Sequence, residues 1–164
     1  MVTCTRDPTA DPVASLPSLP GPLHQEIPIV SVAVAHQASS SAKTVALQHG
    51  AREAKSRGTE LAVLHVVENL DLDVEEAYRS SLTGEIEAAL AAVDAAEVVW
   101  RLHLDTARED VAETIMNLTK TVGADLLVIG ARRRSPLGKF LLGSVTQTLI
   151  LESDLPVLVV KSAP

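Results

Sequence analysis

The chain has 164 residues, about one domain, and 46% of them are hydrophobic, which is enough for a buried core. The net charge of −7 argues against general DNA or RNA binding, which needs a basic face, and is typical of a cytoplasmic protein. Cys4 is the only cysteine, and no apolar run is long enough to span a membrane. We therefore expect no intrachain disulfide, no membrane-spanning helix and no signal peptide.

Residues 1–26 differ in composition from the rest of the chain. Prolines recur in this span among Ser, Thr, Asp and Gly, at Pro8, Pro12, Pro17, Pro20 and Pro22. Because proline fixes φ and has no N–H to donate, no helix or central strand is expected there. We predict a disordered or loosely packed tail, more in keeping with a dispensable extension than with a regulatory arm, followed by a domain over residues 27–164.

Strand and helix patterns alternate from residue 27 onward. Residues 27–35 form a β-branched apolar run that predicts a strand. Helical spacing of apolar residues follows over 41–56, and Gly58 ends that helix. Residues 60–67 predict a second apolar strand. The first half of the domain therefore begins as a strand, a helix and a strand.

The middle of the chain continues this alternation. Residues 74–95 predict a long helix, and residues 97–104 a third strand. The inward face of that helix is expected to carry Leu82, Ile86, Ala89, Leu90 and Val93. Thr106 and Glu109 have the spacing of a capping box, which predicts the start of a third helix, and Gly123 ends it. Residues 125–130, 144–153 and 156–161 then predict a strand, a helix and a strand.

This order of elements predicts an α/β fold with a five-stranded open parallel sheet and helices on both faces. The predicted strands are nearly continuous apolar runs, as a sheet buried on both faces requires. Right-handed crossovers join such units. Open sheets of this kind bind ligands at the carboxyl ends of the strands, where the strand order reverses. That rule directs attention to the connections after the first and fourth strands.

The connection after the fourth strand has the composition of an anion site. It begins at Gly130 and closes with Gly143 and Ser144, at a predicted helix start where Ser144 is a natural N-cap. Free N–H groups in a first helical turn favour anions. Positive charge is added by Arg132, Arg133, Arg134 and Lys139. A phosphate cradle is one interpretation, and a simple turn with a solvated arginine loop is the other.

These residues also resemble a known family signature. Gly130 and the pair Gly143-Ser144 match the first and last positions of G-x2-G-x9-G-[ST], the signature of the universal stress protein family. The segments LAVLHVVE, ADLLVIGAR and LLGSVTQTLILESDLPVLVVK are similar to family members. The resemblance covers residues 27–162.

The resemblance implies a Rossmann-like, adenine nucleotide alpha hydrolase-like fold with strand order 3-2-1-4-5. It also implies a homodimer through residues 156–161, and a regulatory module rather than an enzyme. The implied ligand is ATP or another adenine nucleotide, with Mg²⁺ as the accompanying ion. Phosphate and ribose contacts carry over to Gly130, Arg132, Gly143, Ser144, Val145 and Thr146, and a base contact to Val66.

Two departures from the family pattern leave the ligand open. Arg133 stands where the signature has its second glycine, and it could pair with phosphate or mark lost binding. Residues 34–37 read Val-Ala-His-Gln, without the aspartate that the family usually has at the end of the first strand. The alternative is therefore a dimeric interaction or signalling protein that binds no nucleotide.

Other residue types that carry chemistry have simpler explanations. His65 and His103 lie in predicted strands and are expected to be structural, whereas His36, at the end of the first strand, is a weaker candidate for a ligand contact. No metal-binding histidine spacing, G-x-S-x-G elbow or Walker loop is present. Asp105, Glu109 and Asp110 are expected to be first-turn helix charges rather than catalytic carboxylates. A slow ATPase is disfavoured, because the loop offers no general base and no metal-binding carboxylate.

Overall fold

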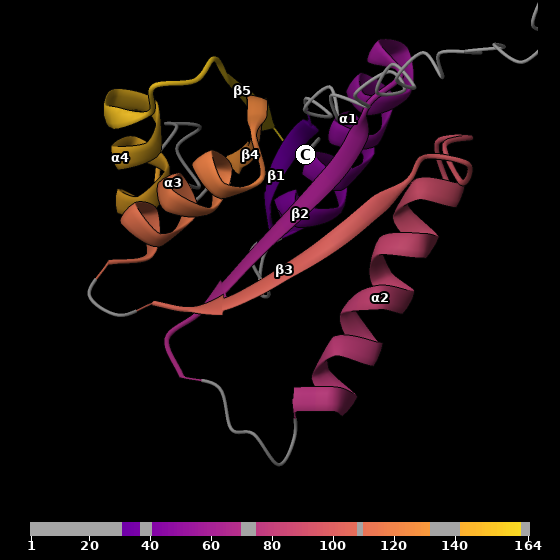
Figure 1. Cartoon of the computed structure of the whole chain (residues 1–164), viewed down its shortest axis with the longest axis horizontal. Coiled ribbons are helices and arrows are strands. Elements are labelled where there is room, and N and C mark those ends of the chain that lie inside the picture. The colour runs from indigo at the N-terminus through magenta and orange to yellow at the C-terminus, as the bar shows by residue number, and fades with distance from the viewer. Residues whose placement is uncertain (1–30, 37–40, 70–74, 108–109, 132–141, 162–164) are drawn as a thin grey trace, which may run out of the picture.

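The computed structural model describes residues 31–36, 41–69, 75–107, 110–131 and 142–161. Strands and helices alternate along the chain, as Figure 1 shows. The elements are β1 (Ser31–His36), α1 (Ser41–Arg57), β2 (Glu60–Val67), α2 (Glu75–Ala91), β3 (Trp100–Thr106), α3 (Val111–Thr121), β4 (Ala124–Ala131), α4 (Ser144–Glu152) and β5 (Val157–Lys161). The strands form one five-stranded parallel sheet in the order β3-β2-β1-β4-β5, which confirms the predicted fold class.

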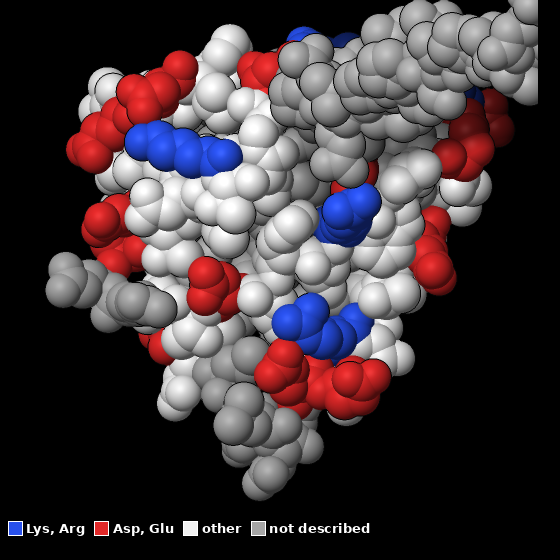
Figure 2. All heavy atoms as spheres, in the orientation of Figure 1, with Lys and Arg blue, Asp and Glu red and all other residues white. Residues whose placement is uncertain are grey.

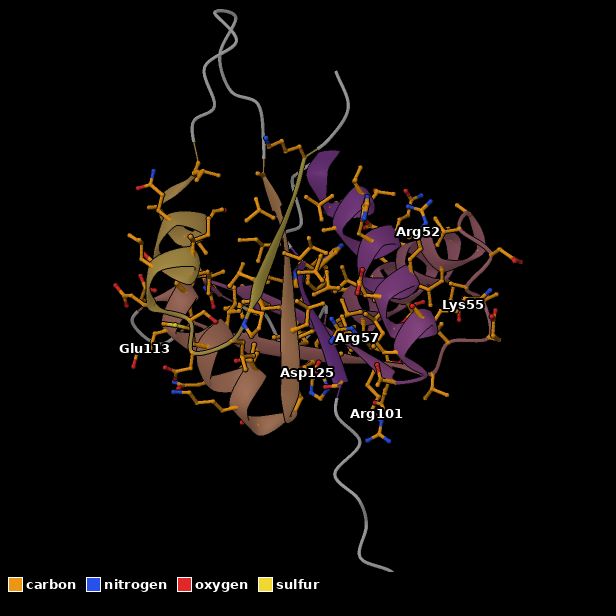
Figure 3. The ribbon with its side chains drawn as sticks, turned by 90° about the horizontal axis from the view of Figure 1, so that it is seen from above. Arg52, Lys55, Arg57, Arg101, Glu113 and Asp125 are labelled. Atoms are coloured by element: carbon orange, nitrogen blue, oxygen red, sulfur yellow. The ribbon has the colours of Figure 1, made fainter. Side chains whose placement is uncertain are left out.

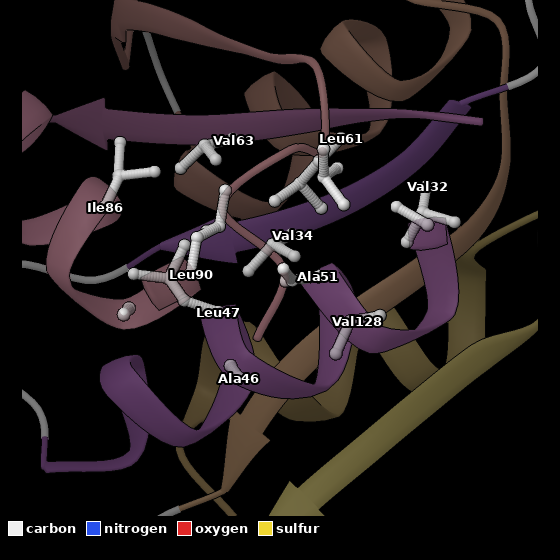
Figure 4. Close-up of a cluster of buried hydrophobic side chains, with 14 of the residues drawn as sticks. Val32, Val34, Ala46, Leu47, Ala51, Leu61, Val63, Ile86, Leu90 and Val128 are labelled. Atoms are coloured by element: carbon white, nitrogen blue, oxygen red, sulfur yellow. The ribbon is translucent and has the colours of Figure 1, made fainter. Parts of the chain in front are cut away.

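Both faces of the sheet are covered by helices. Helices α1 and α2 pack on one face, and α3 and α4 on the other (Figure 1). Along β1, Val32 and Val34 belong to the first apolar cluster, shown in Figure 4, while Ala33 and Ala35 belong to the second. Alternate residues of a strand point to opposite faces of the sheet, and helices cover both faces, so all four side chains are buried. Burial on both faces accounts for the continuous apolar runs in the sequence.

Several element boundaries differ from the prediction. The tail predicted over 1–26 and the start of the first predicted strand lie outside the described residues. The helix predicted to reach residue 95 ends at Ala91, and Asp94 then adopts a left-handed backbone with φ of 55°. The Ala95 N–H donates to the Leu90 carbonyl, which turns the chain toward β3. The third strand consequently starts at Trp100, three residues later than predicted. Leu82, Ile86, Ala89 and Leu90 are buried as expected, and Val93 is partly buried against the same cluster.

Both predicted N-caps are wrong. Thr106 is the last residue of β3, in register with Val67 of β2, so it cannot cap the next helix. Asp110 caps α3 instead, and its carboxylate accepts hydrogen bonds from the backbone N–H groups of Ala112 and Glu113. Ser144 is the first helical residue of α4 rather than its cap. The cap position belongs to Gly143, which has no side chain to offer.

Ion pairs join elements at the amino edge of the sheet. Arg57, at the end of α1, approaches Asp125 of β4 with 3.2 Å between Nη1 and Oδ2 (Figure 3). Arg101 of β3 pairs with Glu60 of β2 at 2.8 Å. These pairs are partly exposed, so each contributes at most about 1 kcal/mol. On the face in Figure 2, the basic side chains of the described residues stand apart from one another and form no continuous basic surface.

None of the described helices is both long enough and apolar enough to cross a membrane.

Candidate functional site

The order of the strands reverses between β1 and β4. The chain leaves β1 toward α1 on one face and leaves β4 toward α4 on the other face. Ala35 of β1 lies opposite Ile129 of β4, and one residue further along each strand stand His36 and Gly130. Such a reversal opens a crevice at the carboxyl edge of the sheet, which is where ligands bind in open α/β folds. The candidate ligand site predicted from the sequence lies at this same edge.

The amino-terminal end of α4 is open. Gly143 is exposed, with φ of −65° and ψ of 157°, and among the described residues no side chain makes a capping hydrogen bond there. A Cβ added to Gly143 would meet nothing within 4 Å among the described residues. In α3, by contrast, the Asp110 carboxylate already accepts hydrogen bonds from the backbone N–H groups of the first turn. Within the part of the chain that the structure describes, the first turn of α4 therefore keeps N–H donors for an external acceptor.

The remaining predicted site residues are distributed around this edge. Ser144 is exposed, Val145 half-buried and Thr146 buried, all in the first turn of α4. Gly130 lies in β4, opposite Val160 of β5. Residues Val66 and Val145 pack against one apolar cluster, on the face covered by α3 and α4. Residues Arg132 and Arg133 lie outside the described residues.

A chain of polar side chains at the same edge was not predicted as a unit. His36 ends β1 and lies in register with His65 of β2, with 2.8 Å between their Nδ1 atoms. His65 Nε2 lies 2.7 Å from the Tyr78 hydroxyl, and His36 Nε2 lies 3.4 Å from Glu85 Oε1. Lys43 Nζ approaches the Glu85 carboxylate at 2.8 Å. His65 is therefore the structural histidine that was expected.

The ligand contact considered for His36 does not match this arrangement. Both ring nitrogens of His36 have partners within the chain, and the residue is 2% exposed. Burial lowers the pKa of His36, and it lowers the pKa of His65 to about 4 with a contribution from the neighbouring His36. Burial by itself raises the pKa of Glu85, but the hydrogen bond from Lys43 and the nearby His36 bring the net pKa below its usual range.

Two hollows lie outside the predicted set of site residues, and the first adjoins Val66, which is in register with Asp105. One, of about 460 Å³, is lined by residues at the end of β3 and along α3, including Asp105 and Asp110. Asp105 lies in β3, where it accepts a hydrogen bond from the Thr106 N–H, so the prediction of a helix-start charge is wrong for it. Asp110 is the cap of α3 and therefore stands at the helix start as expected, while Glu109 lies outside the described residues. The other hollow, of about 430 Å³, lies at the amino edge beside Lys55 and Val99. Over the described ranges, no group of three or more His, Cys, Asp and Glu side chains could hold a metal ion.

A parallel sheet in the order 3-2-1-4-5, with its crevice between the first and fourth strands, defines a Rossmann-like α/β protein. The chain belongs to the universal stress protein family, because the sequence model of the "Universal stress protein family" matches residues 30–161. A universal stress protein of Mycolicibacterium smegmatis is 37% identical over 116 residues, which are 71% of this chain and 86% of that protein.

Solved structures of the same family have the same fold. The structure of a universal stress protein from Archaeoglobus fulgidus matches with a TM-score of 0.63 and 25% identity, over 79% of this chain and 97% of that one. The universal stress protein from Archaeoglobus fulgidus in complex with dAMP matches with a TM-score of 0.61 and 23% identity. That match covers 81% of this chain and 98% of the other.

Proposed function

We propose that this protein is a regulatory module that binds an adenine nucleotide at the carboxyl edge of β1 and β4. The observation that carries the proposal is the amino-terminal end of α4, where Gly143 leaves the first-turn N–H groups without a side-chain cap among the described residues. A phosphate group suits such a position, because it accepts several N–H hydrogen bonds and is favoured by the positive end of the helix dipole. The dAMP bound by the Archaeoglobus fulgidus relative supports the adenine nucleotide class.

Each predicted residue has a role in this proposal. The N–H groups of Ser144, Val145 and Thr146 hold phosphate and ribose oxygens, and Gly143 lets them approach. Gly130 keeps the end of β4 free of a side chain, and Val66 contacts the base from the end of β2. Arg132 and Arg133 supply positive charge to the phosphates, which a planar guanidinium can bind through two hydrogen bonds. Mg²⁺ accompanies the ligand when that ligand is ATP.

Small molecules released from the natively purified protein test the proposal. Mass spectrometry of the denatured protein should detect an adenine nucleotide, and calorimetry of nucleotide-free protein should show saturable binding of ATP, ADP or AMP. Failure of both measurements would contradict the proposal.

A second candidate function is a dimeric interaction protein of the same fold that binds no nucleotide. His36 favours it, because this side chain takes the place of the family's usual aspartate and already bonds to His65 and Glu85. In that case Arg133 blocks the site, and Arg133→Gly should create or strengthen ATP binding. Unchanged binding in that variant would argue against the second candidate.

We propose that the bound nucleotide is not turned over appreciably. The sequence places no general base and no metal-binding carboxylate in the connection after β4. Phosphate release from ATP should therefore stay at the background rate. Hydrolysis above background that is lost in Ser144→Ala would instead assign a slow ATPase activity to this site.

The free edge of β5 supports a homodimer. β5 ends the sheet and pairs only with β4 among the described strands, and Val157, Leu158 and Val159 remain partly exposed. An apolar edge strand is a template for association unless it is covered. Sedimentation equilibrium should give about twice the chain mass of 17.3 kDa. A monomer mass over the whole accessible concentration range would contradict this arrangement.

A further inference from the structure

Five side chains from four elements form one continuous hydrogen-bonded chain at the carboxyl edge. Tyr78 and Glu85 come from α2, Lys43 from α1, His36 from β1 and His65 from β2. The contacts run from the Tyr78 hydroxyl to His65, from His65 to His36, from His36 to Glu85, and from Lys43 to Glu85. The hydrogen-bonded chain thus joins α1 and α2 to β1 and β2, on the face that these helices cover.

The direction of every hydrogen bond follows from one carboxylate. The ionised Glu85 can only accept, so His36 carries its proton on Nε2. In neutral His36 the Nδ1 atom is then bare, and the Nδ1 of His65 must donate to it. His65 Nε2 is consequently an acceptor, and Tyr78 donates its hydroxyl proton. Neutral His65 is thereby held in the Nδ1–H tautomer.

The same chain can accept one proton and lose no hydrogen bond. If His36 becomes an imidazolium, its Nδ1–H donates to His65, and the proton of His65 moves to Nε2 and donates to the Tyr78 oxygen. A second proton cannot be accommodated, because two N–H groups would then face each other across the 2.8 Å between the Nδ1 atoms. The hydrogen-bonded chain therefore has two protonation states in which all of its hydrogen bonds are made. They differ by one proton and by the direction of two hydrogen bonds.

The surroundings of the pair set the energetic cost of the charged state. The His36 side chain is fully buried, and His65 is 1% exposed. Among the described residues, the ionisable groups that face them are Glu85 and Tyr78 of α2 and Lys43 of α1. With Glu85 and Lys43 ionised, the neutral chain carries no net charge, and the protonated chain carries a buried charge of +1. Burial lowers the pKa of both histidines accordingly, with Glu85 opposing and Lys43 reinforcing the effect at His36.

We propose that Tyr78, His65, His36, Glu85 and Lys43 form a one-proton acid switch that ties the stability of the helix–sheet packing to pH. Acidification charges the buried histidine pair, reverses the hydrogen bonds between His36 and Tyr78, and weakens the packing of α1 and α2 on β1 and β2. His36 follows Ala35 at the end of β1, beside the crevice, but the switch does not depend on nucleotide binding.

The expected pH dependence of stability has a definite sign. Because the pKa of each histidine is lower in the folded chain than its ordinary value, the unfolded chain binds more protons as the pH falls below about 6.5. The contribution to stability is fully present above that pH and is lost as the pH falls toward the folded-state values. Urea midpoints should therefore decrease between pH 7 and pH 4.5.

Nitrogen-15 NMR of the imidazole rings tests the switch on the unaltered full-length protein. At pH 7.5, His65 should show the Nδ1–H tautomer and His36 the Nε2–H tautomer. On acidification, His36 should become an imidazolium, and His65 should change to the Nε2–H tautomer without becoming doubly protonated. An Nε2–H tautomer for His65 at pH 7.5, or independent full protonation of both rings near pH 6.5, would overturn the proposal.

Two substitutions should move the transition in opposite directions. Glu85→Gln removes the charge that stabilises the imidazolium, and it should lower the pH midpoint of His36 by about one unit or more. Lys43→Gln removes an opposing charge and should raise the midpoint. Glu87→Gln, an exposed change on α2, is the matched control and should leave the midpoint unchanged. A shift of the same sign in both variants would overturn the proposal, and the wild-type spectra decide the question if Glu85→Gln fails to fold.

Discussion

Replacing Gly50 by valine is expected to destabilise the protein by about 3 kcal/mol, at the upper end of the usual cost of overpacking a core. Gly50 is a buried residue of α1, and that helix packs across β1, β2, β4 and β5. A Cβ at this position would overlap Cγ2 of Val34 and come within 3.2 Å of Cδ1 of Leu61. Both neighbours are fully buried, so neither can move aside without displacing the cluster in Figure 4.

Gly84→Val is the matched control for the effect at Gly50. Gly84 is exposed on α2, and an added Cβ would meet nothing within 4 Å among the described residues. Valine should stabilise the protein by about 0.4 kcal/mol there, because its helix propensity is better than that of glycine. The measurement is the free energy of unfolding in urea for both variants and the wild type. Equal effects at the two glycines would show that α1 does not lie as close to β1 as described.

Gly143→Val is expected to reduce adenine nucleotide affinity at least tenfold, about 1.4 kcal/mol, while leaving the fold intact. The backbone at Gly143 has an extended conformation that valine adopts readily, and an added Cβ meets nothing within 4 Å among the described residues. Stability should therefore change by no more than about 0.5 kcal/mol. The loss of affinity arises because the branched side chain stands where a phosphate would approach the first turn of α4.

Calorimetry measures the nucleotide affinity of Gly143→Val, and urea unfolding measures its stability. Together they distinguish an effect on binding from an effect on folding. Gly84→Val serves again as the control, since it lies on α2 and should bind nucleotide as the wild type does. If Gly143→Val binds the nucleotide with wild-type affinity, Gly143 does not lie in the nucleotide site. A loss of affinity matched by an equal loss of stability would also count against a direct contact.

The sequence was most informative where burial alone dictates the pattern. Strands such as β1 and β4 are buried on both faces, so their apolar runs identified them without any knowledge of their neighbours. Strand order is set by long-range packing, and it was inferred only through the family resemblance. The cap of α3 was misplaced because Thr106 and Asp110 both suit an N-cap, and the choice depends on how far β3 pairs with β2.

The polar chain at the carboxyl edge shows why part of the site escaped prediction. His36 and His65 are 29 residues apart in sequence, and only the register of β1 with β2 makes them neighbours. Tyr78 and Glu85 reach them because α2 packs beside α1 on the same face. A signal was present, since each histidine stands near the end of an apolar strand, but pairing them requires the sheet register. Gly143 and Ser144 were found because a local motif carries them.

Amide NMR during an ATP titration tests most directly whether the nucleotide binds at the carboxyl edge. The account predicts saturable chemical-shift changes at Val66, at Gly130 and in the turn from Gly143 to Thr146. The amino edge, around Lys55 and Val99, should remain unchanged. No change with millimolar ATP, or changes confined to the amino edge, would contradict the account.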